Sequence, residues 1–229
     1  MKNNYSFRKI TGEYKKGEVV LYLGKVNSGK TKILVSEAVN ELVRQKSVLF
    51  CSFEKKESLI EKDIKIALTA IKYKKEVSLI TKQIGLGETN PIKKIDILIR
   101  SLKSNGKNID VVFVDGIVCK TTDALPEYHL LKKLATELNV LLFINLQLSL
   151  NHFGGNFSEI AIKQLSENHI DYIYKFDKEE KKLSILKIKN KLSNIKLDAS
   201  IDFMFLTILK LILIIIFMIL LRMIFLWFM

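Results

Sequence analysis

Several residue types are scarce in this chain of 229 residues, which has two cysteines, two prolines, one tryptophan and three histidines. Cys51 and Cys119 both lie in apolar runs, so a disulfide scaffold is excluded and reduced core thiols in a reducing compartment are expected. With only two cysteines and three scattered histidines, we do not expect a tetrahedral zinc site. Few prolines and no Gly/Ser-rich stretch interrupt residues 1–200, which predicts one globular domain there.

Arginine is also scarce, although the chain is strongly basic. Only 4 of its 37 basic residues are arginine, and its formal net charge is +13. A surplus of this size is typical of proteins that bind a polyanion such as nucleic acid. The abundance of lysine, isoleucine and asparagine equally indicates the amino-acid bias of an AT-rich genome. The charge alone leaves both explanations open.

Apolar residues are unevenly distributed and concentrate at the carboxy-terminal end. The opening residues MKNNYSF contain no apolar segment, so no cleaved signal peptide is expected. From Phe203 to Met229, 24 of 27 residues are apolar, with Lys210 and Arg222 among the exceptions. This length suits a spanning helix, and we predict a transmembrane anchor over 203–229 on an otherwise cytoplasmic protein. The alternatives are a helix buried on the core and out-of-frame translation of AT-rich DNA.

Strand-like and helix-like patterns alternate through the first 200 residues. Apolar runs predict strands over residues 18–23, 47–53, 110–114, 139–145 and 171–176, with a closing strand over 183–189. Helical spacing predicts helices over residues 32–44, 60–71, 91–102 and 130–138. Near-continuous apolar strands separated by helices predict an α/β fold, with a mostly parallel sheet covered by helices on both faces.

The most specific motif is GKVNSGKT over residues 24–31, which matches G-x-x-x-x-G-K-[ST] at every position. It lies between a predicted strand and a predicted helix, where backbone N–H groups and the helix N-terminus can hold phosphates. Lys30 is expected to reach the terminal phosphates, and the Thr31 hydroxyl is expected to ligate Mg²⁺. The motif therefore predicts ATP and Mg²⁺ as cofactors, with Gly24, Asn27, Ser28, Gly29, Lys30 and Thr31 as the binding residues.

Three further polar residues lie at the ends of predicted strands. Asp115 ends the run IDVVFVD and is the candidate metal-holding carboxylate, or else an ordinary turn acid before Gly116. Glu54 ends SVLFCSFE, where it would face the γ-phosphate and polarise water as a general base. Gln147 follows the fourth strand as a candidate γ-phosphate sensor, or else as a polar residue of a loop.

The order of these segments resembles the RecA-like ATPase core of the DnaB-type hexameric replicative helicases. The resemblance extends from about residue 6 to residue 205. ITGEYKKGEVVLYLGKVNSGKT is similar to the family's P-loop region, VLFCSFE to its strand with the catalytic glutamate, and IDVVFVD to its Walker-B strand. LLKKLATELNVLLFINLQLS resembles the segment that ends in the family's Gln motif, and HIDYIYKF and LSILKIKNK resemble its last strands and Lys-x-Arg element.

The resemblance implies an ATPase domain over residues 1–202 that acts in replication or repair. Its implied partners are single-stranded DNA and further copies of the chain, up to a hexameric ring. By position, Glu54 would act as base and Gln147 would couple the γ-phosphate to a DNA-facing loop. Lys189 and Lys191 would occupy the element that reaches the neighbouring subunit's nucleotide. The implied catalytic residues are Glu54, Lys30, Gln147 and Lys191.

The chain also departs from that family's pattern. Lys191 stands where the family has an arginine finger, and lysine supplies charge without a planar fork. Ser149 and Leu150 replace the Asn-Arg pair after the Gln motif, and these 229 residues contain no counterpart of the primase-contacting domain. Two alternative functions therefore stay open. One is a regulatory or loader-like P-loop ATPase without unwinding activity, and the other is a membrane-attached P-loop protein with a protein partner.

Overall fold

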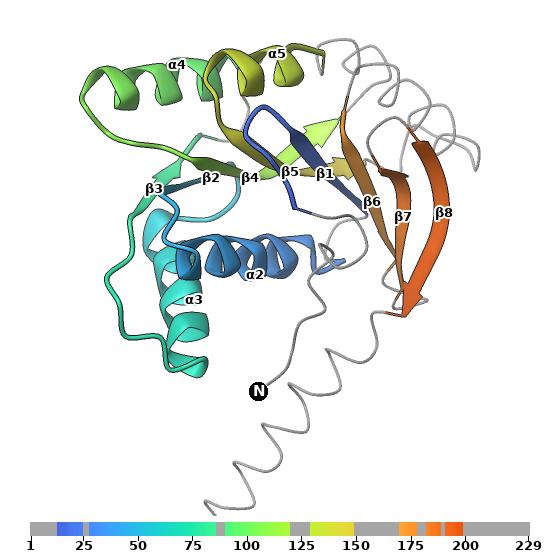
Figure 1. Cartoon of the computed structure of the whole chain (residues 1–229), viewed down its shortest axis with the longest axis horizontal. Coiled ribbons are helices and arrows are strands. Elements are labelled where there is room, and N and C mark those ends of the chain that lie inside the picture. The colour runs from blue at the N-terminus through green and yellow to red at the C-terminus, as the bar shows by residue number, and fades with distance from the viewer. Residues whose placement is uncertain are drawn as a thin grey trace, which may run out of the picture.

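The computed structural model describes residues 13–24, 28–85, 90–119, 129–148, 170–177, 182–188 and 191–198. Strands and helices alternate along these ranges until the last three strands (Figure 1). The strands are β1 (Val19–Gly24), β2 (Val48–Ser52), β3 (Leu79–Gln83), β4 (Val111–Cys119), β5 (Leu141–Leu148), β6 (Tyr172–Asp177), β7 (Lys182–Ile188) and β8 (Lys191–Asp198). The helices are α2 (Lys30–Val43), α3 (Glu57–Ala70), α4 (Pro91–Ser104) and α5 (His129–Glu137).

All eight described strands form one sheet in the order β3-β2-β4-β5-β1-β6-β7-β8. The pairs from β3 to β6 are parallel, whereas β6–β7 and β7–β8 are antiparallel. The first strand therefore lies near the middle of the sheet, between β5 and β6, and the chain crosses over β5 and β4 to reach β2. This arrangement places the ends of β1, β2, β4 and β5 along one edge of the parallel part.

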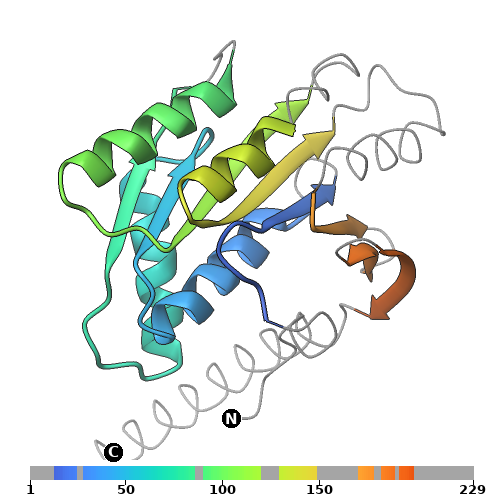
Figure 2. The ribbon, with the colours of Figure 1, turned by 45° about the horizontal axis from the view of Figure 1, so that its top comes forward.

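Helices cover both faces of the parallel part, with α4 and α5 on one face and α2 and α3 on the other (Figures 1 and 2). Because successive side chains of a strand point to opposite faces, each strand contributes to two cores. In β1, Leu21 and Leu23 pack with the side chains of α4 and α5, whereas Val20 and Tyr22 pack with those of α2 and α3. This two-sided burial explains why the parallel strands are almost continuously apolar in sequence.

A row of aromatic rings crosses the sheet beneath α2. Phe50, Phe113 and Phe143 lie on β2, β4 and β5 with neighbouring rings stacked, at centroid separations of 5.8 and 4.7 Å. Tyr22 on β1 and Tyr174 on β6 continue the row with a centroid separation of 5.1 Å. The row links five neighbouring strands and fixes their register on the α2 face, since an aromatic side chain shifted by one residue would point to the other face.

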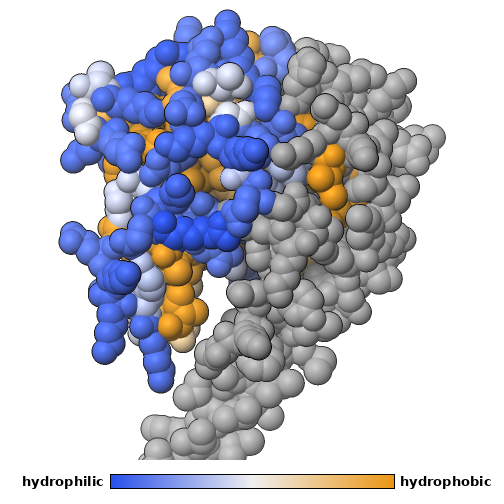
Figure 3. Space-filling view, viewed as in Figure 1, coloured by the Kyte–Doolittle hydropathy of each residue, from blue (hydrophilic) through white to orange (hydrophobic). Residues whose placement is uncertain are grey.

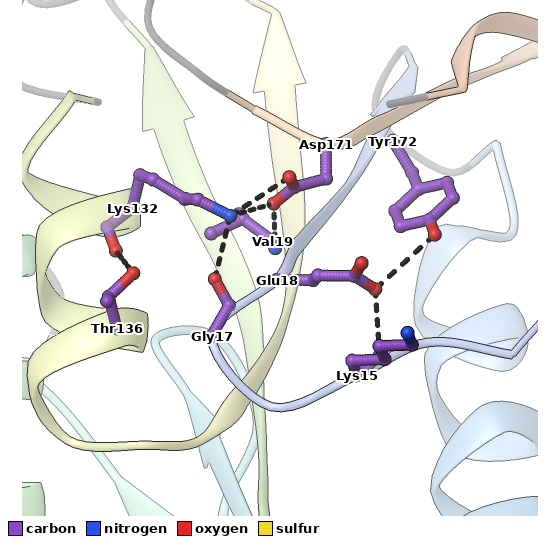
Figure 4. A network of polar contacts seen from close by, with 8 residues as sticks. All are labelled: Lys15, Gly17, Glu18, Val19, Lys132, Thr136, Asp171 and Tyr172. Atoms are coloured by element: carbon purple, nitrogen blue, oxygen red, sulfur yellow. Dashed lines mark hydrogen bonds and ion pairs between the residues drawn. The ribbon is translucent and has the colours of Figure 1, made fainter. Parts of the chain in front are cut away.

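A polar network joins the amino-terminal ends of β1 and β6 to α5 (Figure 4). The Lys132 ammonium donates to the Gly17 carbonyl at 2.8 Å and to both carboxylate oxygens of Asp171 at 2.9 and 2.7 Å. Asp171 also accepts from the Val19 backbone N–H at 2.8 Å. Because the lysine is paired and hydrogen-bonded, its partial burial costs little. The network anchors the first residues of β1 at the edge opposite the P-loop.

Local sequence signals account for where the helices begin. Gly29 precedes α2 with a φ of 97°, a left-handed conformation that glycine adopts without strain. Pro91 occupies the first turn of α4, and the Asn90 side chain accepts from the Lys93 backbone N–H at 2.9 Å. In α3, Ile60 and Ile64 are the buried residues, four positions apart on one helical face.

The described surface is largely hydrophilic on the face shown in Figure 3, with apolar residues in smaller patches between charged ones. Within the described ranges, no helix is long and apolar enough to cross a membrane. Residues 203–229 lie outside those ranges, so the predicted anchor and the domain boundary at residue 202 stay predictions.

The predicted α/β fold with a mostly parallel, two-sided sheet is confirmed. Two strands were not predicted, namely β3 and β8. Strand β3 has partly exposed and polar positions because it has only one neighbour in the sheet. The interpretation of Asp115 as the last residue of its strand was wrong, because β4 continues to Cys119.

Candidate nucleotide-binding site

The P-loop motif joins β1 to α2, as its sequence predicted. Gly24 is the last residue of β1, and Lys30 is the first residue of α2. The Lys30 ammonium donates to the Gly24 carbonyl at 2.8 Å and to the Ser28 hydroxyl oxygen at 3.3 Å. Both side chains are buried, with exposures of 7% for Lys30 and 3% for Ser28. The loop therefore closes around the lysine; Asn27 lies outside the described residues.

Gly24 is required at its position by close packing. A Cβ atom there would lie 2.9 Å from the Ser28 hydroxyl oxygen and 3.0 Å from the Phe176 carbonyl oxygen. The second contact is with the backbone of β6, which cannot move aside as a flexible side chain can. The first glycine of the motif thus allows β1 to run beside β6 up to the point where the P-loop begins.

Thr31 and Asp115 meet although they are 84 residues apart in sequence. The Thr31 hydroxyl donates to Asp115, whose two carboxylate oxygens lie at 3.0 and 3.1 Å from it. The Asn145 side-chain amide donates to the first of these oxygens at 2.7 Å. Asp115 and Asn145 are each only 1% exposed. The carboxylate is therefore held from two directions, by the helix after the P-loop and by β5.

A β-bulge in β4 accounts for this meeting. Val114 pairs with Ile144 and Ile117 pairs with Leu146, so Asp115 and Gly116 together lie opposite Asn145 alone. Gly116 has a φ of 85°, which a glycine tolerates and most other residues do not. Bulges commonly redirect a side chain beside an active site. Here the bulge directs the Asp115 carboxylate toward the start of α2.

Glu54 lies beside this bulge, two residues after β2. The Phe53 N–H donates to the Asp115 carbonyl at 2.9 Å, and the Ser52 hydroxyl oxygen accepts the Glu54 and Lys55 backbone N–H groups. The Glu54 side chain packs against Gly116 so closely that a Cβ at residue 116 would lie 2.7 Å from the Glu54 Cγ. The absence of a side chain at Gly116 therefore creates the space that Glu54 occupies.

The charged groups of the site shift one another's pKa values. Burial lowers the pKa of Lys30, and the nearby carboxylates of Glu54 and Asp115 oppose that shift. Desolvation, followed by the negative charge of Asp115, raises the pKa of Glu54, while Lys30 and Lys55 oppose the rise. A carboxylate with a raised pKa is a better proton acceptor than an ordinary one, which suits a general base.

The remaining predicted site residues are placed differently. Gln147 lies within β5, directly opposite Gly24 in the pairing of β1 with β5, so the prediction that it follows the strand was wrong. Its position beside the beginning of the P-loop agrees with its predicted neighbourhood. Lys191 begins β8 at the far edge of the sheet, three strands from β1, and is not brought to this site. Lys189 lies outside the described residues.

The donor set of the site fits Mg²⁺. Thr31 supplies a hydroxyl oxygen and Asp115 a carboxylate, and Mg²⁺ is commonly held by one or two carboxylates together with phosphate oxygens and water. In the described part of the chain, no group of three or more His, Cys, Asp or Glu side chains gathers as an all-protein metal cluster. The residues therefore suit a metal ion that arrives with a nucleotide.

Asn145 was not predicted to belong to the site. In the sequence it is one residue near the end of an apolar strand, and only the pairing of β5 with the bulged β4 brings it to Asp115. The available signal was its polarity within the run VLLFIN, since a polar residue in a strand buried on both faces needs a hydrogen-bonding partner.

Comparisons with known proteins support the fold. Neither the protein-family models nor the curated proteins contain a match to this chain. Among solved structures, the ATPase domain of a DnaB-like helicase is similar, with a TM-score of 0.58 and 16% sequence identity over 84% of each chain. This likeness shows a RecA-like fold of the kind found in DnaB-like ATPase domains, as the motifs predicted.

Proposed function

We propose that this chain binds and hydrolyses ATP as a DnaB-like, helicase-type ATPase that acts on single-stranded DNA in replication or repair. The observation that carries the proposal is the contact between Thr31 and Asp115, at 3.0 and 3.1 Å, at the start of the helix that follows the P-loop. Glu54 lies against the next residue, Gly116. Phosphate-binding, metal-holding and proton-accepting groups thus converge at one edge of the sheet.

The chain's own residues divide the work of phosphate binding. The amino-terminal end of α2 presents backbone N–H groups and partial positive charge to the β- and γ-phosphates. Lys30, which has a lowered pKa but also two acidic neighbours, supplies a compact positive charge. Thr31 and Asp115 hold Mg²⁺, which when bound neutralises charge on the phosphate oxygens.

Glu54 is the residue placed to accept a proton from the attacking water. Ser52 fixes the backbone at Glu54, and Gly116 leaves room for its side chain. Because a general base acts in its deprotonated form, the raised pKa of Glu54 moves the acid limb of the rate profile above the pH expected for an ordinary glutamate. Gln147, opposite Gly24, would report the γ-phosphate to the loop that follows β5.

Action on DNA in a ring is supported by the RecA-like fold and by the net charge of +13. The backbone also places Lys191 at the turn of the β7–β8 hairpin, on the outer edge of the sheet. A residue at that edge suits the proposed contact with the nucleotide of a neighbouring subunit. The proposed assembly is a homo-oligomer up to a hexamer.

One observation favours a second candidate function, a regulatory or loader-like ATPase without unwinding activity. Lys191 replaces the arginine finger, and arginine fingers contribute about 10³–10⁵-fold to hydrolysis in related chemistry. Lysine cannot form the planar two-pronged contact of arginine. ATP binding with slow, DNA-insensitive hydrolysis is the behaviour expected of this second candidate.

The proposal is tested first by the binding of Mg²⁺ and ATP, using Lys30→Ala with Lys62→Ala as the matched control. Lys62 is an exposed lysine of α3, so its replacement removes the same charge far from the site. We expect Mg²⁺–ATP to raise the melting temperature of the wild type and of Lys62→Ala, but not that of Lys30→Ala. Equal ATP-dependent shifts in all three proteins would refute a nucleotide site centred on Lys30.

The two candidate functions are separated by hydrolysis rates measured with and without single-stranded DNA. We expect DNA to stimulate the wild type. Glu54→Gln should bind Mg²⁺–ATP normally and lose about 10²–10⁴-fold in rate, the usual contribution of a general base. A wild-type rate that does not respond to DNA would favour the regulatory candidate instead.

A further inference from the structure

We propose that Asn145 is a positioning residue that sets the affinity of the nucleotide site for Mg²⁺, by holding the Asp115 carboxylate in place opposite the β-bulge. This inference rests on the proposed nucleotide-binding function and deepens it. It concerns a residue of β5 that lies outside the P-loop and outside the strand that carries the metal-holding acid.

The first observation is the direction of the hydrogen bond. The Asn145 Nδ2 atom lies 2.7 Å from Asp115 Oδ1. An ionised carboxylate only accepts hydrogen bonds, so the amide must present its NH₂ group. A charge-assisted bond of this kind is short and strongly directional. Asn145 therefore constrains the rotation of the Asp115 side chain more tightly than contact with an apolar residue would.

The second observation is where the bulge places the pair. Asp115 and Gly116 share Asn145 as their single opposite residue, so regular strand pairing does not hold the backbone there. The left-handed φ of Gly116 further loosens the local preference for extended structure. At this irregular point the side-chain bond from Asn145 takes over the task of tying β4 to β5.

The third observation is the cost of keeping an amide at this position. Asn145 is 1% exposed, and its Oδ1 atom makes no hydrogen bond within the described residues. A buried acceptor without a partner lowers stability, so an apolar side chain would serve the β5 strand better if packing were its only task. The amide is explained by its bond to Asp115.

The geometry also divides the carboxylate into two parts. Oδ1 accepts from both Asn145 and Thr31, whereas Oδ2 accepts from Thr31 at the longer distance of 3.1 Å. Asn145 thus saturates one oxygen and leaves the other better able to face a cation. Partners of this kind orient carboxylate ligands, and their loss typically weakens metal affinity about 10–100-fold.

The test measures Mg²⁺-dependent binding of a fluorescent ATP analogue by wild type, Asn145→Leu and Asn145→Ala. Leucine is similar in size to asparagine but has no donor, and alanine is a second variant in case leucine does not fit. The matched control is Thr81→Val, which removes another buried side-chain hydrogen bond, to Glu61, from β3 at the far side of the sheet.

We expect the half-saturating Mg²⁺ concentration to rise about 10–100-fold in the Asn145 variants and to stay unchanged in Thr81→Val. Binding of the nucleotide in EDTA should be equal in all four proteins. Unchanged Mg²⁺ dependence in folded Asn145 variants would overturn the inference while leaving the proposed function intact. Failure of both variants to fold would also overturn it, by showing a purely structural role. A wild type without Mg²⁺-dependent binding would instead refute the proposed function.

Discussion

Replacing Gly116 by alanine tests how the bulge positions the proposed base. The new Cβ would lie 2.7 Å from the Glu54 Cγ and 3.1 Å from its Cδ, whereas ordinary contacts begin at 3.4 Å. The two carbons must therefore separate by at least a further 0.7 Å, and Glu54 has to move because Gly116 is held within β4. A misplacement of about 1 Å at a reacting group can cost about 10²-fold in rate.

The same substitution also strains the backbone, and this effect needs its own control. Gly116 has a φ of 85°, and a left-handed conformation costs an L-residue roughly 1–2 kcal/mol. Gly106 has a similar φ of 75°, but a Cβ there would meet nothing within 4 Å. Gly106→Ala therefore reproduces the strain without displacing Glu54. Both variants should lose about 1–2 kcal/mol of unfolding free energy in urea.

The assay is steady-state ATP hydrolysis together with Mg²⁺–ATP binding. We expect Gly116→Ala to lose about 10²-fold in kcat with little change in nucleotide affinity, and Gly106→Ala to keep the wild-type rate. In a Glu54→Gln background, Gly116→Ala should have no further effect on the rate, because its target has already been removed. If Gly116→Ala hydrolyses ATP as fast as Gly106→Ala, the reasoning that Glu54 depends on the space at Gly116 is wrong.

Two further predictions concern segments away from the P-loop. Lys191→Arg should raise the hydrolysis rate of the assembled protein by restoring a planar, charged fork, and an unchanged or lower rate in verified oligomers would argue against a role for Lys191 in trans. The full-length chain should sediment with membranes and require detergent, whereas a variant that ends at residue 202 should not; a full-length protein that is monodisperse without detergent would contradict the predicted anchor over 203–229.

Residues inside one sequence motif were the easiest to predict. The spacing of Gly24, Gly29, Lys30 and Thr31 follows from the loop that must wrap a phosphate, so sequence alone indicated both the chemistry and the strand–loop–helix setting. Asp115 was also identified, because a carboxylate after a run of apolar residues is conspicuous. The contact between Thr31 and Asp115 agrees with the roles predicted for both.

Features that depend on pairing between distant strands could not be predicted in this way. The bulge at Asp115 and Gly116 exists only relative to the register of β5, and no local pattern in IDVVFVDGIVC specifies that register. Asn145 belongs to the site for the same reason. Strand β3 escaped prediction because an edge strand with exposed positions has a weaker apolar pattern than a central strand.

The central place of β1 has a consequence for how the protein forms during synthesis. β1 is made first, yet its two partners are β5 and β6, and β5 begins 117 positions after β1 ends. At about 5–20 residues per second, the apolar strand VVLYLG therefore waits roughly 6–25 s for its first neighbour. During that interval β2, β3 and β4 can already pair with one another. Insertion of β1 between β5 and β6 must come late, so the ability to bind nucleotide should be among the last properties that the newly made chain acquires.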